Sequence, residues 1–558
     1  MSIDLAISLG HNSSCVAIDH VDGNILCGFE EERLTGVKSD SAYPVLSIEK
    51  CMSTLQRPSV RHIYISHWFA DGRLKPCKYY DDSHIKSLGA QLVVSVSKDI
   101  THHDAHNYSA LAFAQSSPGF ESDFFSLVVD GFGTQGECLS LYQSTTESAK
   151  YAKTRLLHRA FGYNKSLGIL YQYATAFLGM KMQQDEYKLL GYEAHADELT
   201  EDHFDVVADR ASKLTAKYFK GIMNPIDIDR DKDPIVNINA LKMTKDGVFE
   251  ELWALLNEFD IDDRTDFDAK VLVSILVQQV VEDVVLQIVR TYGIKKLICS
   301  GGVFMNVKLN LKLSQMVEKL CVMPLAGDQG AAIGLYHYHN QNLKWPNHLY
   351  WGHRPWNKLD KFNDVKGIEV YGDRGSFIDA VLKELTKGPG YVNIVTGDME
   401  YGPRALCNTT TLAIPDRENT EAINKLNDRT TVMPMAPVMT EEMASKYLQP
   451  FYQGVHKSLE YMIAACVLNK GVDSFDGAAH KYEGPWFGWT FKTCRPQILS
   501  AGHPVYDVLE KIGKPLINTS FNYHGVPIVY DEKDIVNSHI KQNENGVIKT
   551  LILVESNQ

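Results

Sequence analysis

Short apolar runs that end in small or polar residues recur along the first 330 positions of the chain. The first run is Ile3 to Leu9, a turn of glycine, histidine, asparagine and serines follows at 10–14, and a second run covers Cys15 to Ile18. Short apolar runs bounded by turn residues predict β-strands. Such a pair is most simply an ordinary hairpin, although the N–H groups of the turn could also face a phosphate.

Three later apolar runs also lead into turns rich in glycine, asparagine or aspartate. Phe124 to Val129 leads into the turn 130–133, Leu297 to Ser300 into 301–306, and Cys321 to Pro324 toward 327–330. Because ligands of α/β folds bind at the carboxyl ends of strands, these turns are candidate site segments. We therefore predict one large α/β unit over residues 1–355, built from two similar subdomains around a cleft.

The remainder of the chain predicts a second, smaller α/β domain over residues 356–558. The segment 340–360 contains two prolines and three tryptophans and is read as a linker. Ser376 to Thr386 has a helical pattern, and strands are expected at Tyr391 to Thr396 and Lys549 to Val554. The most apolar stretch, Val271 to Val289, is interrupted by polar residues and predicts a buried helix rather than a membrane span.

Composition and charge narrow the classes of protein. The chain has 558 residues, 44% of them hydrophobic, and a formal net charge of −13. Such an acidic chain is not expected to bind membranes or, strongly, duplex nucleic acid. The ten cysteines include no C-x-x-C pair, which argues against a zinc ribbon or a disulfide scaffold, and no signal peptide is evident. We therefore expect a cytoplasmic protein.

A histidine cluster at 102–106 is the strongest local sign of chemistry. His102 and His106 are four residues apart, so on a helix both imidazoles lie on one face and could bind one metal ion. Asp130 and Asp328 stand at predicted strand ends and could complete the site. Two histidines and two aspartates suit iron or another divalent metal. A surface helix with chance histidines, or a metal hydrolase using this cluster alone, are the alternatives.

A second group of polar and basic residues lies in the C-terminal part. Arg404 lies in a turn bounded by glycine and proline, and Lys425, Arg429 and Arg495 follow downstream. The sequence Asn-Thr-Ser-Phe-Asn at 518–522 is expected to end the strand that starts at Pro515. Arginine forks near hydroxyl and amide groups suit a phosphate or an adenylate. The alternatives are solvated surface charges and a capped turn, and 186–191 is read as a helix end with a surface ion pair.

Taken together, these motifs resemble the O-carbamoyltransferase family of nodulation-factor, cephamycin, novobiocin and tobramycin biosynthesis. Many family motifs occur in order along the chain, and their ordered occurrence is far more specific than any one of them. They are GHNSS at 10–14, EEERLTGVK at 30–38, HHDAH at 102–106, DGFG at 130–133, SLGILY at 166–171, EYKLLG at 186–191, SGGVFMN at 300–306, GDQG at 327–330, GPRAL at 402–406, MPMAP at 433–437, RPQ at 495–497 and NTSFN at 518–522.

The resemblance implies both a fold and a reaction. The fold would be a TsaD-like N-terminal domain of the actin-like ATPase class with two subdomains, followed by a smaller YrdC-like α/β domain. The YrdC-like part would form carbamoyl adenylate from carbamoyl phosphate and ATP, with Mg as the partner of ATP. The TsaD-like part would then transfer the carbamoyl group to an acceptor hydroxyl. A homodimer is compatible with the sequence.

The resemblance also assigns residues to roles. The ligands of a divalent metal, expected to be Fe(II), would be His102, His106, Asp130 and Asp328. His11 would be the base that takes the acceptor proton, and Arg404 would act at the catalytic centre as well as on the adenylate. Nucleotide or carbamoyl adenylate would be bound by Gly301, Gly302, Asn306, Arg404, Lys425, Arg429, Arg495, Ser520 and Asn522.

The chain departs from the family pattern at several positions. Cys407 replaces a glycine and Thr409 an arginine, while Asn427, Thr430 and Met433 replace a lysine, a glutamate and an arginine. Either Lys425, Arg417 and Arg429 compensate for the lost positive charge, or adenylation is weak.

The acceptor is not fixed by the motifs. A sugar-like or antibiotic-like hydroxyl is one hypothesis. The aromatic segment 482–491 suggests a second, a 5-hydroxymethyl-pyrimidine nucleotide, because its rings could stack on a base; a hydrophobic flap is the plainer reading. A tRNA threonylcarbamoyl-transfer enzyme and a catalytically inactive binding protein with the same fold are the rival functions.

Overall fold

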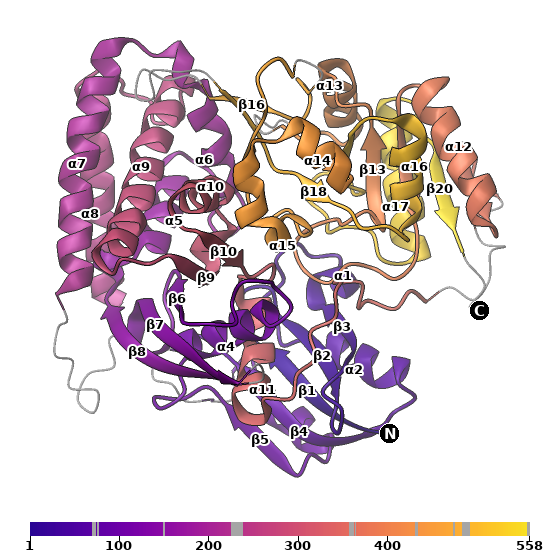
Figure 1. Cartoon of the computed structure of the whole chain (residues 1–558), viewed down its shortest axis with the longest axis horizontal. Coiled ribbons are helices and arrows are strands. Elements are labelled where there is room, and N and C mark those ends of the chain that lie inside the picture. The colour runs from indigo at the N-terminus through magenta and orange to yellow at the C-terminus, as the bar shows by residue number, and fades with distance from the viewer. Residues whose placement is uncertain are drawn as a thin grey trace.

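A computed structural model describes residues 1–69, 74, 77–148, 151–224, 238–355, 362, 364–429, 434–472, 475–482 and 491–554. Two sheets are built from the first part of the chain and two from the last part, with helices packed around them (Figure 1). The protein therefore belongs to the mixed α/β class, as the alternation of strand and helix patterns predicts.

The first sheet has the order β3-β2-β1-β4-β5. Its strands are β1 (Ser2–Ser8), β2 (Ser14–Asp19), β3 (Ile25–Glu30), β4 (Ser59–Ser66) and β5 (Leu92–Ser95). β1, β2 and β3 are antiparallel neighbours, and β4 and β5 run parallel to β1. Alternate residues of β1, namely Ile3, Leu5 and Ile7, are fully buried in one hydrophobic cluster that includes residues of α2 (Val45–Thr54).

The second sheet repeats this topology with the order β10-β9-β6-β7-β8. Its strands are β6 (Phe124–Val129), β7 (Glu137–Ser148), β8 (Tyr151–Phe161), β9 (Lys296–Ser300) and β10 (Lys319–Val322). Here β6, β7 and β8 are antiparallel neighbours, and β9 and β10 run parallel to β6. The turns after β1 and β6 therefore occupy equivalent positions in the two sheets.

Two helices lie between these sheets and carry part of the site. α4 (His102–Ala114) packs on β6 and β9, and α11 (Ala331–Asn340) packs on β1 and β4. The two helices also pack on each other, which Gly334 permits because a Cβ there would lie 1.8 Å from the Ala105 carbonyl oxygen. This close contact fixes the distance between the two sheets.

A helical layer covers the far side of the second sheet. It contains α5 (Leu167–Phe177), α6 (Tyr187–Tyr192), α7 (Glu201–Met223), α8 (Ile238–Asn257), α9 (Phe267–Thr291) and α10 (Val307–Met316) (Figure 1). α9 is long and apolar enough to cross a membrane by length and composition, but 83% of its most apolar window is buried. It packs on α5, α6 and α7, which is the buried helix predicted from its polar interruptions.

The C-terminal part contains a mixed seven-stranded sheet of order β11-β20-β12-β13-β19-β14-β18. The strands are β11 (Ile368–Tyr371), β20 (Thr550–Leu553), β12 (Tyr391–Val395), β13 (Thr409–Ala413), β19 (Leu516–Ser520), β14 (Ala436–Met439) and β18 (Gln497–Ile498). The helix pairs α12 (Arg374–Thr386) with α16 (Pro504–Ile512), and α13 (Arg417–Leu426) with α17 (Glu532–Asn545), pack within this part.

The two parts of the chain share one hydrophobic core. A small sheet of β15 (Cys466–Val467), β17 (Phe491–Cys494) and β16 (His480–Tyr482) lies where they meet. Across the contact, the ring centroids of Phe113 and Tyr461 are 5.6 Å apart. The polar motif at 518–522 stands at the end of a strand, as expected: residues 518–520 are the last three of β19, where they pair with β13, and Asn518 also pairs with β14.

Candidate active site

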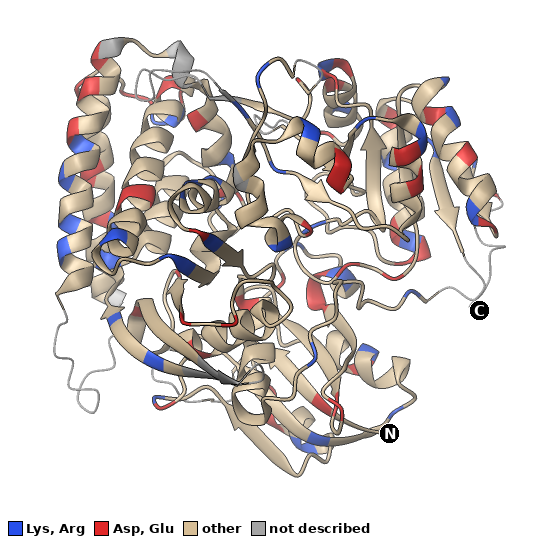
Figure 2. Cartoon of the chain, in the orientation of Figure 1, with Lys and Arg blue, Asp and Glu red and all other residues tan. Residues whose placement is uncertain are grey.

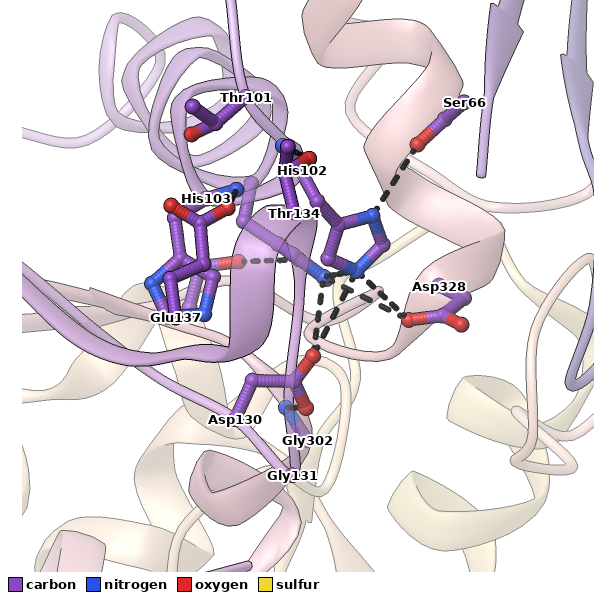
Figure 3. A network of polar contacts seen from close by, with 12 residues as sticks. Ser66, Thr101, His102, His103, Asp130, Gly131, Thr134, Glu137, Gly302 and Asp328 are labelled. Carbon is purple, nitrogen blue, oxygen red and sulfur yellow. Dashed lines mark hydrogen bonds and ion pairs between the residues drawn. The ribbon is translucent and has the colours of Figure 1, made fainter. Parts of the chain in front are cut away.

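The two histidines of α4 meet the two aspartates from distant strand ends. The His102 Nε2 and His106 Nε2 atoms are 3.1 Å apart. His102 Nε2 lies 3.5 Å from Asp130 Oδ2 and 3.3 Å from Asp328 Oδ1. The matching distances from His106 Nε2 are 3.8 Å and 3.5 Å. The structure thus brings together all four residues that the resemblance assigns to a metal. Figure 3 shows the side chains of His102, Asp130 and Asp328 pointing toward one another.

Local structure positions each of these side chains. Thr101 and Asp104 form a capping box that starts α4 at His102, so the two imidazoles come from its first two turns. Asp130 directly follows β6, and Gly302 N–H donates to its Oδ1 atom at 3.0 Å. A side chain at Gly302 would lie 2.9 Å from that oxygen. This glycine therefore positions the carboxylate through its backbone (Figure 3).

The four donor atoms fit a divalent cation. An ion with bonds of about 2.1 Å holds neighbouring ligand atoms roughly 3.0–3.4 Å apart, and the observed separations are close to this range. The outer Nδ1 atoms lie 3.5 Å from Ser66 Oγ and 3.4 Å from Ser300 Oγ, which orients both rings. Burial alone would lower the pKa of His102, but the charge of Asp328 and the contact with Asp130 raise this pKa to about 10. The site therefore attracts positive charge.

One cavity of about 530 Å³ connects this cluster to the C-terminal part. Asp130 and Asp328 line one region of it, and residues of the C-terminal part line the other. The sequence-predicted residues that line it are His11, Asp130, Gly302, Asn306, Asp328, Arg404, Arg429, Arg495, Ser520 and Asn522. Side chains separated by more than 500 positions thus face one space.

Arg404 and Arg495 give this cavity an excess of positive charge. Both are half-buried, and no carboxylate of the described residues lies within ion-pair distance of either guanidinium. The Arg404 Nε atom is buried without a hydrogen-bond acceptor in the described part of the chain. Burial lowers the pKa of Arg404 to about 10, and burial together with the charge of Arg404 lowers the pKa of Arg495 well below its ordinary value. Two guanidinium groups without an ion-pair partner among the described residues are suited to binding an anion.

Two buried carboxylates hold the loop that carries Arg404. Glu30 accepts a hydrogen bond from Gly402 N–H at 3.0 Å, and Arg33 donates to the Gly402 carbonyl at 2.8 Å. Glu400 Oε1 accepts three backbone N–H groups, from residues 406, 408 and 409. The N-terminal glutamate-rich motif at 30–33 therefore positions a C-terminal arginine.

Arg429 has a different role from the other two arginines. Its guanidinium donates to Thr519 Oγ1 at 3.2 Å, to Ser520 Oγ at 3.2 Å and to Asn522 Oδ1 at 2.6 Å. Burial lowers its pKa to about 10. Arg429 thus fixes the end of β19 and turns its polar side chains toward the cavity.

Three other residues that were expected to bind nucleotide have structural roles or lie away from the cavity. Asn306 caps α10 by accepting from Leu309 N–H at 3.0 Å and also bonds Gln278, so its amide is already satisfied. Gly301 does not line the cavity; it has φ +96°, and a Cβ there would lie 2.3 Å from the Val129 carbonyl oxygen, so it makes the turn possible. Lys425 is exposed on α13 and does not line the cavity.

Several cavity residues were not recognised from the sequence. Lys38 is an exposed residue that lines the cavity, where partial desolvation lowers its pKa. Glu186, Tyr187 and Lys188, read as a surface helix end, also line it, although Lys188 does pair with Asp185 at 2.8 Å. Only their place in the ordered family motifs marked them, because a short charged stretch looks the same on any solvated surface.

The departures from the family pattern have local explanations. Cys407 adopts φ +79°, the left-handed conformation that favours the glycine expected there. The Thr409 hydroxyl accepts a hydrogen bond from Arg354. Asn427 accepts from Gln542 at 2.7 Å in the core. Of the three basic residues considered for compensation, Arg429 alone lines the cavity, and Arg417 is exposed and paired with Glu421. Thr430, Met433 and the segment 483–490 lie outside the described residues.

Comparison with known proteins identifies the class of enzyme. The family model described as carbamoyltransferase N-terminus matches residues 83–335, and the model described as carbamoyltransferase C-terminus matches residues 383–555. The chain belongs to the carbamoyltransferase family and is a carbamoyltransferase.

Relatives match nearly the whole chain. A protein of Methanocaldococcus jannaschii, MJ1051, is 27% identical over 98% of this chain and 98% of its own. The nodulation protein NolNO of Sinorhizobium fredii is 24% identical over 99% of this chain and 80% of its own. The nodulation protein NolO of Bradyrhizobium diazoefficiens is 26% identical, covering 82% and 78%.

Likenesses among solved structures are weak. HypF in its phosphate- and nucleotide-bound form has a TM-score of 0.30 at 14% identity, covering 62% of this chain and 47% of that chain. A ROK family protein from Streptococcus pneumoniae has a TM-score of 0.28 at 10% identity, covering 62% and 100%. Scores of this size do not identify a fold.

Proposed function

We propose that the protein is an ATP-dependent O-carbamoyltransferase that makes and uses carbamoyl adenylate. Carbamoyl phosphate, Mg-ATP and water would give carbamoyl adenylate, pyrophosphate and phosphate, and transfer to a hydroxyl would release AMP. The observation that carries the proposal is the single cavity, because it joins an anion site built by arginines to a cluster suited to a cation. The repeated strand topology of the first two sheets supports the actin-like assignment, and the C-terminal sheet is assigned to the YrdC-like step.

The chain's own groups suggest how the two steps are divided. Arg404 and Arg495 would bind the phosphate groups of ATP and the adenylate, since they have no other partner among the described residues. Ser520 and Asn522, oriented by Arg429, would contact the adenylate. His11 follows β1 and lines the same cavity, where it would accept the proton of the acceptor hydroxyl.

The cation site would serve the transfer step. A divalent metal, with Fe(II) as our first candidate, would supply Lewis-acid polarisation of a carbonyl or phosphoryl oxygen when bound by the four side chains. His102 and His106 hold their Nε2 atoms close to Asp130 and Asp328, which line the cavity and provide the negative charge.

The acceptor is proposed by class only. A hydroxyl of a sugar-like or antibiotic-like molecule, or of a 5-hydroxymethyl-pyrimidine nucleotide, would enter the cavity. Acidic and basic residues are interspersed over the described chain, for example along α7 (Figure 2). Such a surface favours a small acceptor over tRNA. A cytoplasmic location is part of the proposal and agrees with ten free cysteines.

The proposal is tested by product analysis. The purified enzyme is incubated with carbamoyl phosphate and Mg-ATP, and carbamoyl adenylate and pyrophosphate are followed by mass spectrometry and a coupled assay. Hydroxylated acceptors are then screened for a mass gain of one carbamoyl group. We expect carbamoyl adenylate and pyrophosphate to form in the absence of an acceptor, and AMP to be released when an acceptor is added. Absence of carbamoyl adenylate and pyrophosphate above background would contradict the adenylation step.

A further inference from the structure

A second cluster of ligand-type side chains lies on the first sheet, among residues that do not line the cavity. Asp4 belongs to β1, His20 directly follows β2, and His62 belongs to β4. One ligand atom from each lies within 4.8 Å of the others. We propose that these three side chains bind a divalent transition-metal ion, which joins three neighbouring strands at the start of the fold.

The backbone places all three side chains before any ion binds. The register of the parallel β1–β4 pair sets Asp4 beside His62, and the register shifts between Ile3 and Asp4. Such an irregularity re-aims a side chain at one position of a strand. His20 N–H donates to the Ser2 carbonyl at 3.2 Å, which holds the residue after β2 against the start of β1. The cluster is therefore organised by main-chain hydrogen bonds.

The donor atoms have the spacing and chemistry of a metal site. Asp4 Oδ1 lies 3.0 Å from His20 Nδ1 and 3.5 Å from His62 Nδ1. These separations match neighbouring ligands on an ion with bonds of about 2.1 Å. The two imidazole rings are 4.9 Å apart and inclined at 73°, so they approach edge to face rather than stacking. Two imidazoles and one carboxylate suit zinc, iron or cobalt.

Charge gives the second argument. Asp4 is 1% exposed, and no lysine or arginine of the described residues forms an ion pair with its carboxylate. A buried carboxylate needs a positive partner. Among the described residues this one is contacted by the two imidazoles and by the His62 backbone N–H, which donates to Oδ1 at 3.0 Å, so no fixed positive charge balances it. The side chains of His20 and His62 are 30% and 24% exposed. A cation could therefore enter from solvent, and water could complete its coordination.

The experiment counts metal ions per chain. Full-length protein is stripped with a chelator, dialysed to equilibrium against Co²⁺ and analysed for cobalt and protein. We expect two equivalents in the wild type, one in His20→Gln, one in His106→Ala, and none in the double variant. His84→Gln is the matched control, because His84 also pairs with a carboxylate, Glu49 at 3.3 Å, but belongs to no three-ligand cluster among the described residues. It should keep two equivalents.

Two readouts decide the proposal without reference to activity. Co²⁺ should raise the thermal midpoint of His106→Ala, and this rise should disappear in the double variant. Glutamine at position 20 can still donate to Asp4, so the variant is expected to fold; His62→Gln is the second variant, and circular dichroism checks both. An unchanged cobalt count in folded His20→Gln and His62→Gln would overturn the proposal and indicate a metal-free hydrogen-bonded cluster. The cobalt counts do not depend on catalysis, so a protein that transfers no carbamoyl group would still give the same counts.

Discussion

Replacing Arg404 with methionine should make the ligand-free protein more stable and the enzyme less active. Methionine keeps an unbranched apolar stem but removes the charge. Arg404 is charged at pH 7 in the folded and the unfolded chain, so the folded state alone bears the cost of burying this charge. No carboxylate of the described residues pairs with it, and its charge also lowers the pKa of Arg495. At this position, the charge that binds an anion also lowers the stability of the ligand-free protein.

The structure sets the size of both effects. A pKa lowered to about 10 corresponds to roughly 3 kcal/mol, and because water in the cavity screens the half-buried charge, we expect a gain of about 1–2 kcal/mol in unfolding free energy. A charge-assisted hydrogen bond contributes about 1.5–3 kcal/mol, so kcat/KM for ATP–pyrophosphate exchange should fall roughly 10- to 150-fold.

Urea denaturation and carbamoyl phosphate-dependent ATP–pyrophosphate exchange measure the two effects. Arg417→Met is the control, because Arg417 is exposed and paired with Glu421 on the surface of α13. It should change stability by less than about 0.5 kcal/mol and leave exchange unchanged. A less stable Arg404→Met protein with normal exchange would refute the reasoning.

Three further predictions test other parts of the account. Burial lowers the pKa of His337 to about 4, whereas an unfolded histidine titrates near 6.5, so stability is lost as the pH falls from about 6.5 toward 4. Between pH 7 and pH 5 the unfolding free energy of the wild type, measured by urea denaturation, should fall by about 2 kcal/mol more than that of His337→Gln. Equal decreases in the two proteins would contradict this. Cys407→Gly should change the unfolding free energy by less than about 1 kcal/mol, because relief of the left-handed conformation offsets the lost packing. Cys407→Val should lower the unfolding free energy by more than about 2 kcal/mol. Similar stabilities of the two variants would show that the conformation is not strained. Lys38→Met should raise the KM for ATP or carbamoyl phosphate about tenfold with little change in kcat, because one charged contact to the bound substrate is lost. Unchanged steady-state constants would place Lys38 outside the substrate site.

Local patterns in the sequence predicted most of the elements that frame the site. The apolar runs at 3–9, 124–129 and 297–300 are strands, and the polar interruptions of α9 indicate its buried position. The four-residue spacing of His102 and His106 predicts that their rings share a helix face. Their meeting with Asp130 and Asp328 depends on how two sheets and η5 (Asp328–Gly330) pack, which no local pattern encodes. Their positions at predicted strand ends made the two aspartates candidates, and the family resemblance then assigned all four residues to one site.

Charge alone was a poor guide to the C-terminal half of the site. Lys425 and Arg417 are basic and near the motifs but lie on the exposed face of α13, whereas Lys38 and Lys188 reach the cavity from the N-terminal part. Asn306 is different: an asparagine three residues before a buried helical leucine is a capping pattern, and this could have been recognised. Which charges face the cavity is decided by contacts between parts of the chain that are hundreds of residues apart.

The most direct test of the central claim, that one cavity holds two separable steps, follows radiolabelled carbamoyl adenylate in His106→Ala. Wild type and variant are incubated with Mg-ATP and labelled carbamoyl phosphate, and an acceptor found in the screen is then added. We predict pyrophosphate release within about twofold of wild type in the variant, with carbamoyl adenylate that persists after the acceptor is added, whereas wild type consumes it and releases AMP. Equal loss of adenylate formation and transfer in folded His106→Ala, or equal retention of both, would contradict the account.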